Sequence, residues 1–135
     1  MRIVIDTNVI LDIFLKREPF FDDSYSAIRK ATEKNTECYI SSSAVTDIFY
    51  ILRKAMQSSE KARTILNDLM QLVTFSDVLA SDIMDALVSD MPDFEDAVVN
   101  AVARRINASY ILTRNTKDYA KADVLVVSPK DYLKL

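Results

Sequence analysis

Residues 3–8 read Ile3-Val4-Ile5-Asp6-Thr7-Asn8, and this short stretch decides the fold class. The β-branched run before Asp6 predicts a buried strand, because such residues favour extended backbone. After Asn8 the apolar residues recur at helical spacing, at positions 9, 10, 13 and 14, which predicts a helix. A strand that turns directly into a helix is typical of α/β proteins.

The same alternation continues outward to the end of the chain. Further strands are predicted at 38–40, 72–75, 110–113 and 124–127, and helices at 22–34, 43–56, 58–69, 77–88 and 92–105, with a short helix or turn from 129. Asn35 and Asn107 are expected to end their helices, Asn35 in the left-handed conformation that glycine usually supplies. The pattern predicts one domain over residues 1–135, a three-layer α/β/α fold around a mostly parallel sheet of four to five strands.

Composition is that of an ordinary soluble globular domain. Of the 135 residues, 50% are hydrophobic and 27% are charged, which is enough apolar surface for one core. The net charge of −3 means that any contact with nucleic acid must be local. Asp6 interrupts the first apolar run and no apolar stretch is long, so neither a signal peptide nor a membrane span is indicated.

Missing residue types narrow the chemistry. Histidine is absent, which excludes catalytic triads that contain it and histidine-ligated metals. Glycine is also absent, which excludes the Gly-rich loops of Rossmann and P-loop sites. The single cysteine, Cys38, has no partner for a disulfide. We interpret it as a buried structural thiol, and the compartment as the reducing cytoplasm.

Oxygen-bearing side chains gather where the predicted strands end. Asp6 ends the first strand, Asp47 lies near the start of the helix after the second, Asp96 lies in the first turn of the helix before the fourth, and Asn115 and Asp118 follow the fourth. Open parallel sheets bind ligands at this edge, near the point where the strand order reverses. Clustered carboxylates repel one another unless a cation compensates them, and Mg²⁺ or Mn²⁺ prefers oxygen ligands. The placement therefore predicts a metal site.

Each of these residues also has a purely structural interpretation. Asp6 can cap the helix that follows it, and Asp93 with Asp96 resembles a capping box. Asp47 can be a solvent-facing acid that complements a helix dipole, and the two polar residues after the fourth strand are ordinary turn residues. Only their common placement favours a functional site.

Four segments in series resemble the PIN-domain family of metal-dependent ribonucleases, which includes VapC-type toxins of prokaryotic toxin–antitoxin pairs. They are residues 3–8, residues 40–43 leading to Asp47, Asp93-Phe94-Glu95-Asp96-Ala97, and Leu112-Thr113-Arg114-Asn115-Thr116-Lys117-Asp118-Tyr119. By position, the resemblance implies a catalytic and metal-binding set of Asp6, Asp47, Asp96 and Asp118, with Asn115 as a further metal ligand. Asn8 and Thr113 would support the site.

Two positions depart from the family's pattern. The family more often has Glu where Asp47 stands, so the carboxylate here is one methylene shorter. Many members have Asp where Asn115 stands, and an amide can coordinate a metal but brings no charge. The resemblance therefore leaves open whether Asn115 or Asp118 fills the fourth position.

The resemblance implies hydrolysis of RNA phosphodiester bonds by a water that Mg²⁺ or Mn²⁺ activates. The RNA would be single-stranded or structured, with Arg114 and Lys117 contacting its phosphates and Arg53 or Lys54 as further candidates. For each of these cations the alternative is a solvated surface. An antitoxin protein and a second copy of the chain are the candidate protein partners, and no membrane contact is expected.

Two other functions remain open on the sequence. A PIN-like fold with a weakened metal site would bind RNA or protein without catalysis, and Asp47 and Asn115 keep this alternative open. A phosphatase or phosphoacceptor domain of the haloacid-dehalogenase or receiver type also places an Asp after the first strand. Here the second Asp beside Asp6 is missing, although Lys117 would serve as the later lysine.

Overall fold

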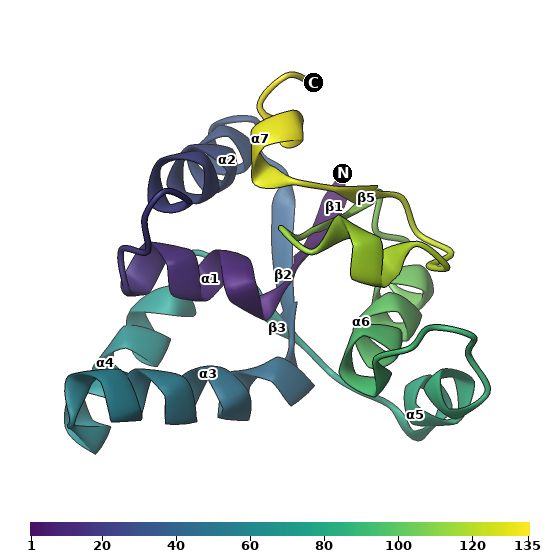
Figure 1. Cartoon of the computed structure of the whole chain (residues 1–135), viewed down its shortest axis with the longest axis horizontal. Coiled ribbons are helices and arrows are strands. Elements are labelled where there is room, and N and C mark those ends of the chain that lie inside the picture. Colours follow the sequence, from purple (N-terminus) through teal and green to yellow (C-terminus); the bar gives the residue numbers. More distant parts are fainter.

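A computed structural model of the protein describes residues 1–135 and contains one five-stranded sheet in the order β3-β2-β1-β4-β5 (Figure 1). Every neighbouring pair of strands is parallel. The strands are β1 (Arg2–Ile5), β2 (Glu37–Ser41), β3 (Thr74–Ser76), β4 (Tyr110–Leu112) and β5 (Val126–Val127). The predicted α/β class and parallel sheet are confirmed.

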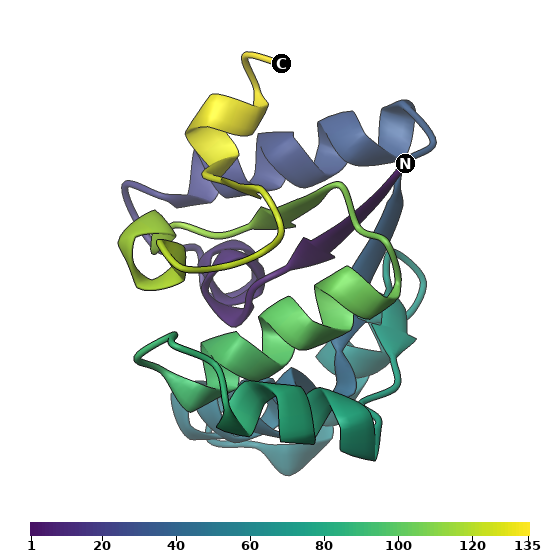
Figure 2. The same ribbon diagram turned by 90° about the vertical axis from the view of Figure 1, so that its right-hand side faces the viewer.

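Helices cover both faces of this sheet, as Figures 1 and 2 show. They are α1 (Thr7–Phe14), α2 (Phe21–Glu33), α3 (Ser42–Met56), α4 (Ser59–Leu69), α5 (Ala80–Leu87), α6 (Phe94–Arg105) and the short α7 (Pro129–Tyr132), with a 3₁₀ turn η1 (Thr116–Tyr119) after β4. Helices α1 to α4 pack on one face and α5 and α6 on the other. None of the helices combines the length and hydropathy that crossing a bilayer requires.

The central strand β1 contributes to both layers of the core. Ile3 and Ile5 belong to the apolar cluster beneath α1 to α4, whereas Val4 belongs to the cluster beneath α6. All three side chains are at most 1% exposed. Successive side chains of a strand point to opposite faces, so a continuous β-branched run is what a strand covered on both sides requires.

The site edge of the sheet is set by its topology. The chain leaves β1 toward β2 on one side, and β4 returns to pair with the other side of β1. Ile5 pairs with Leu112 in the register, and the Asp6 N–H donates to the Leu112 carbonyl at 2.9 Å. The first residues beyond β1 and β4 therefore lie side by side, at the point where strand order reverses.

Several element boundaries differ from the predictions, and the differences are largest for β3, β5 and α5. β3 covers Thr74–Ser76 rather than 72–75, and β5 has only two residues. Helix α5 begins at Ala80 rather than at 77, because the Asp82 carboxylate accepts a hydrogen bond from the Leu79 N–H at 2.9 Å and fixes the first turn there. The predicted left-handed conformation of Asn35 is confirmed, with φ of 56°, and Asn107, which was predicted only to end its helix, is left-handed as well, with φ of 57°.

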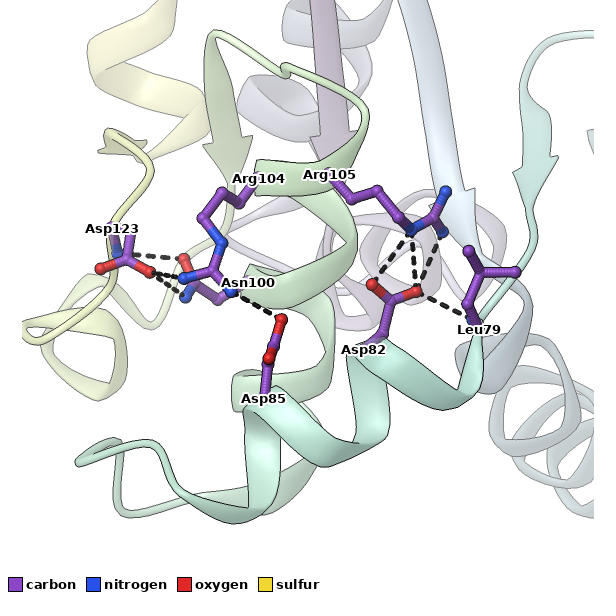
Figure 3. Close-up of polar contacts among 7 residues, drawn as sticks. All are labelled: Leu79, Asp82, Asp85, Asn100, Arg104, Arg105 and Asp123. Carbon is purple, nitrogen blue, oxygen red and sulfur yellow. Dashed lines mark hydrogen bonds and ion pairs between the residues drawn. The ribbon is translucent and has the colours of Figure 1, made fainter.

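Polar contacts hold α6 in place from two sides (Figure 3). Arg105 donates to both oxygens of the buried Asp82 of α5 at 3.0 Å. Burial opposes ionisation of Asp82, but the hydrogen bonds from Arg105 and Leu79 outweigh it and lower the pKa of this carboxyl. On the other side, Asn100 is 6% exposed and its Oδ1 accepts the backbone N–H of Asp123 at 3.1 Å. These contacts fix the helix that carries Asp93, Glu95 and Asp96.

Candidate active site

A cavity of about 780 Å³ opens at the carboxyl edge of the sheet, between the first turns of α1, α3 and α6. We call it the acidic cavity, because its lining includes six carboxyl groups: Asp6, Asp47, Asp93, Glu95, Asp96 and Asp118. The amides of Asn8 and Asn115 line it as well. The structure therefore brings together the predicted oxygen donors from four separate segments of the chain.

Asp6 occupies the junction between β1 and α1 and is 9% exposed. Its Oδ1 accepts the Thr7 N–H at 2.8 Å, and its Oδ2 accepts the Thr113 hydroxyl at 2.8 Å. Burial raises the pKa of Asp6 in spite of these hydrogen bonds. Asp6 is thus the N-cap of α1 and a wall of the acidic cavity at once, so the two interpretations of this residue are compatible.

Asn8 and Thr113 link Asp6 to the loop after β4. Asn8 donates from Nδ2 to Thr113 Oγ1 at 3.2 Å, and its Oδ1 accepts the Arg114 N–H at 3.2 Å. Thr113 is fully buried, and its Oγ1 also accepts the Asn115 N–H at 3.1 Å. These bonds fix the backbone from which the side chain of Asn115 lines the cavity.

Asp96 faces the most unfavourable electrostatic surroundings in the cavity. Burial raises its pKa to about 7, and the negative charges of Asp6 and Asp93 add to the effect. Asp93 is the N-cap of α6 and accepts the Asp96 N–H at 2.9 Å. The capping interpretation is therefore confirmed for Asp93, but no hydrogen bond from the Asp93 N–H to the Asp96 carboxylate completes a capping box. The carboxylate of Asp96 remains free to face Asp6.

Glu95 and Asp47 approach each other from α6 and α3. The pKa of Glu95 is raised, first by the charge of Asp47 and then by burial. The sequence analysis predicts Asp47, but not Glu95, as a site residue. Glu95 adjoins Asp96 in the first turn of α6, and this adjacency was the only signal that could have identified it.

The hydroxyl of Tyr119 is buried beside the carboxylates of Asp6 and Asp96 without a hydrogen-bond partner. The side chain is 2% exposed and its ring packs in the core beneath α6, so it is not available to stack on a base. Burial and the two neighbouring carboxylates raise the pKa of this phenol. A buried polar atom without a partner is uncommon, and the carboxylates of Asp6 and Asp96 are the groups to which this hydroxyl can donate.

The predicted phosphate-binding residues lie outside the cavity lining. The Arg114 guanidinium donates to the buried Asp12 at 2.6 Å and 3.1 Å and lies 3.8 Å from the ring centre of Phe20. Its side chain is 24% exposed. Lys117 is exposed on η1. The only basic residue in the cavity lining is Arg17, which sequence reasoning missed because it lies beyond the end of α1.

The donor set fits a hard divalent cation by its chemistry. The atoms that the acidic and amide side chains offer to a cation are oxygens. The pKa values of Asp6 and Asp96 are raised, and the nearby Tyr119 hydroxyl lacks a hydrogen-bond partner. No three acidic side chains are already close enough to surround a cation. A cation that compensated their charges would therefore also draw these side chains inward.

Comparisons with known proteins identify one family and several similar proteins. A family profile described as "PIN domain" matches residues 2–117. A protein named Ribonuclease VapC1, from Aquifex aeolicus (strain VF5), is 23% identical in an alignment 135 residues long. The alignment covers 97% of this chain and 92% of that protein.

Two solved structures resemble the chain over nearly its whole length. One is described as VapBC2 from Rickettsia felis bound to a DNA fragment from their promoter, with a TM-score of 0.77 at 18% identity and coverage of 95% of this chain and 98% of that one. The other is a toxin–antitoxin complex from Klebsiella pneumoniae, with a TM-score of 0.71 at 20% identity and coverage of 93% and 96%. At these identities the likeness concerns the fold.

Proposed function

The chain belongs to the PIN-domain family, and from this premise we propose that it is a Mg²⁺- or Mn²⁺-dependent endoribonuclease of the VapC toxin type. The observation that carries the proposal is the acidic cavity, in which four chain segments place six carboxyl groups at the switch point of the sheet. The similarity to Ribonuclease VapC1 supports RNA as the substrate class.

The residues that would hold the cation are Asp6, Asp47, Asp96 and one or both of Asn115 and Asp118. Bound there, Mg²⁺ or Mn²⁺ lowers the pKa of a water and stabilises negative charge on the phosphoryl oxygens. Asp6 is the best-fixed member, because Thr7 and Thr113 hold both of its oxygens. Asn8 and Thr113 act by fixing the loop that carries Asn115.

Asp96 is the residue best suited to manage the proton of the attacking water. Burial beside Asp6 and Asp93 raises its pKa in the metal-free protein, and a bound cation would favour the ionised carboxylate, which can accept a proton from water. A carboxylate oxygen of Asp96 would accept a hydrogen bond from the water and orient it toward the phosphorus atom. Glu95 and Asp47, which face each other across the cavity, would bind or orient further waters.

The chain offers several cations to the RNA backbone outside the cavity. Lys117 is exposed, directly precedes Asp118 in η1, and is suited to contact a phosphate. For Arg114 we favour a positioning role, since Asp12 already holds its guanidinium. Arg53 and Lys54 are exposed in the last turn of α3 and stay candidates for a longer RNA.

The proposed protein partner is an antitoxin. The support is that solved neighbours of the same fold are described as toxin–antitoxin complexes, one of them on promoter DNA. A homodimer of this chain and a cytoplasmic location belong to the same proposal. An antitoxin would act by covering the acidic cavity or the surface that RNA crosses.

One observation favours a second candidate function, a PIN-like module that binds RNA or protein without cleaving it. No three acidic side chains are arranged to hold a cation, and the fourth position carries the uncharged Asn115. A phosphoacceptor role for Asp6 has no such support, because hydrogen bonds engage both of its carboxylate oxygens.

The deciding experiment is cleavage of an end-labelled, mixed-sequence single-stranded RNA with Mg²⁺ or Mn²⁺, and with EDTA as a control. The wild type is compared with Asp6→Asn, which keeps an acceptor for the α1 cap, and with Asp68→Asn, an exposed acid on α4 outside the cavity. We expect metal-dependent products that Asp6→Asn reduces by about 100-fold and Asp68→Asn leaves unchanged. A folded wild type without products under either metal would favour the binding module.

A further inference from the structure

Arg17 lies in the turn between α1 and α2, and its backbone is held firmly. The Arg17 N–H donates to the Asp12 carbonyl at 3.0 Å, and its own carbonyl accepts the N–H groups of Phe20 and Phe21 at 3.0 and 2.8 Å. The preceding residue, Lys16, adopts a left-handed conformation with φ of 49°. This turn places the Arg17 side chain in the lining of the acidic cavity.

The guanidinium of Arg17 has no partner within the protein. Among all hydrogen bonds and ion pairs of the structure, none involves the Arg17 side chain, although six carboxyl groups line the same cavity. The nearest buried acid along the chain, Asp12, is already paired with Arg114. A partly buried arginine that is left free at the end of an acidic cavity is available to an anion from outside.

The position of Arg17 along the cavity indicates which anion. Helix α1 starts at Thr7, next to Asp6, and leads away from the sheet edge to Phe14 (Figure 1). At 1.5 Å per residue its eight residues span about 12 Å. The backbone of Arg17 therefore lies roughly one helix length from Asp6, and its side chain reaches the cavity from the far end of α1, where a phosphate that neighbours the reacting one would pass.

An aromatic side chain lines the same cavity. Tyr50 of α3 is 61% exposed and lies in the lining together with Ile51 and Arg17. An exposed tyrosine and a free arginine in one cavity are a combination that can bind a nucleotide, since the ring can stack on a base while the guanidinium binds a phosphate in a bidentate manner.

We propose that Arg17 binds a phosphate of single-stranded RNA that flanks the scissile phosphate, and so fixes the path of the RNA through the acidic cavity. The proposal rests on the ribonuclease function proposed above and adds a specific substrate contact to it. It also explains how an acidic protein can accept a polyanion: cations in the cavity compensate the carboxylates, and Arg17 holds the RNA beyond them.

The test measures RNA binding separately from cleavage. A fluorescein-labelled single-stranded RNA of about 12 nucleotides is bound, in the presence of Mn²⁺, by proteins that carry Asp6→Asn to suppress cleavage. Kd is measured by fluorescence anisotropy at several salt concentrations. To this background we add Arg17→Gln, Arg17→Lys, or the control Lys34→Gln, which removes the same charge from the opposite edge of the sheet.

We expect Arg17→Gln to weaken binding about tenfold, the effect of one charged hydrogen-bonding contact. The slope of log K against log salt should fall by about 0.7, the value for one phosphate of a single strand. Arg17→Lys should keep the slope and lose part of the affinity, because lysine cannot bind a phosphate through two N–H groups. Lys34→Gln should change neither quantity. In the active background, Arg17→Gln should raise KM far more than it lowers kcat.

Two outcomes would overturn the inference. One is an unchanged Kd and salt slope in Arg17→Gln, and the other is an equal change in Lys34→Gln, which would indicate only the loss of overall charge. Failure of the ribonuclease proposal is recognised separately, by the absence of cleavage in the wild type. In that case the binding measurements still decide whether Arg17 contacts RNA. Circular dichroism checks that each variant is folded. The Arg17 side chain makes no hydrogen bond or ion pair within the protein, so its replacement should not unfold the chain.

Discussion

Arg114 and Asp12 form a buried ion pair that ties the loop after β4 to α1, across 102 residues of sequence. Asp12 is fully buried and also accepts the Ser24 hydroxyl at 3.2 Å, and Phe20 covers the guanidinium. Because Arg114 precedes Asn115 directly, the ion pair anchors one wall of the acidic cavity. Removal of either partner leaves a buried charge or a free guanidinium at this wall.

Replacement of Arg114 should therefore cost stability. We expect Arg114→Gln to lower the free energy of unfolding by about 2 to 3 kcal/mol, because the Asp12 carboxylate stays buried without its counter-charge. The measurement is urea unfolding followed by circular dichroism. The control is Arg29→Gln, which breaks a pair whose side chains are 68% and 63% exposed and should change the free energy by less than about 0.5 kcal/mol. Equal effects of the two substitutions would contradict a stabilising role for the ion pair between Arg114 and Asp12.

The metal-free protein should lose stability as the pH rises from 5 to 8. The pKa of Asp96 is about 7 in the folded protein, against 3.8 for an unperturbed aspartate. The folded state therefore holds a proton that the unfolded chain releases, and each rise in pH within this window favours the unfolded chain. Thermal melts in EDTA should show Tm falling across the range, with a much weaker slope in Asp96→Asn.

Addition of Mn²⁺ provides the counter-test for this pH dependence. A cation compensates the ionised carboxylates and binds only the folded chain, so it should raise Tm most at pH 8. If the slope of Tm against pH were the same in wild type and Asp96→Asn, the titrating group would lie elsewhere. Asp6 and Glu95, whose pKa values are also raised, would then be replaced in turn.

The substitution Asn115→Asp tests which residue fills the fourth position of the site. If Asn115 contacts the cation, the added charge should tighten Mn²⁺ binding about tenfold, because ligand charge sets affinity at oxygen sites. Isothermal titration calorimetry measures the Kd directly, and Asp118→Asn is the paired variant. Tighter binding in Asn115→Asp with little change in Asp118→Asn assigns the position to Asn115. The reverse result assigns it to Asp118.

The fold was predictable because its strands carry a strong local signal. β-branched runs such as the one in β1 mark strands covered on both faces, and polar caps mark most helix starts. The start of α5 was not predictable, because its cap comes from the Asp82 side chain, which the buried Arg105 contact holds in place.

The site was predictable only as far as topology allows. Open parallel sheets bind ligands at the carboxyl ends of their strands, and this rule predicts that Asp6 and Asp96 lie close together. The roles of Arg114 and Arg17 depend on contacts across the fold. Whether an arginine near a site is free or paired follows from the position of a buried acid, here Asp12, and no local pattern reports that position.

The order of the strands has a consequence for the protein during its own synthesis. The central strand β1 leaves the ribosome long before its neighbour β4, which is made only after residue 109. Until then one edge of β1 is open, and Thr113, which holds Asp6, does not yet exist. A chain that stops short of β4 would therefore carry an unpaired strand edge, a site for aggregation, and would lack an assembled acidic cavity.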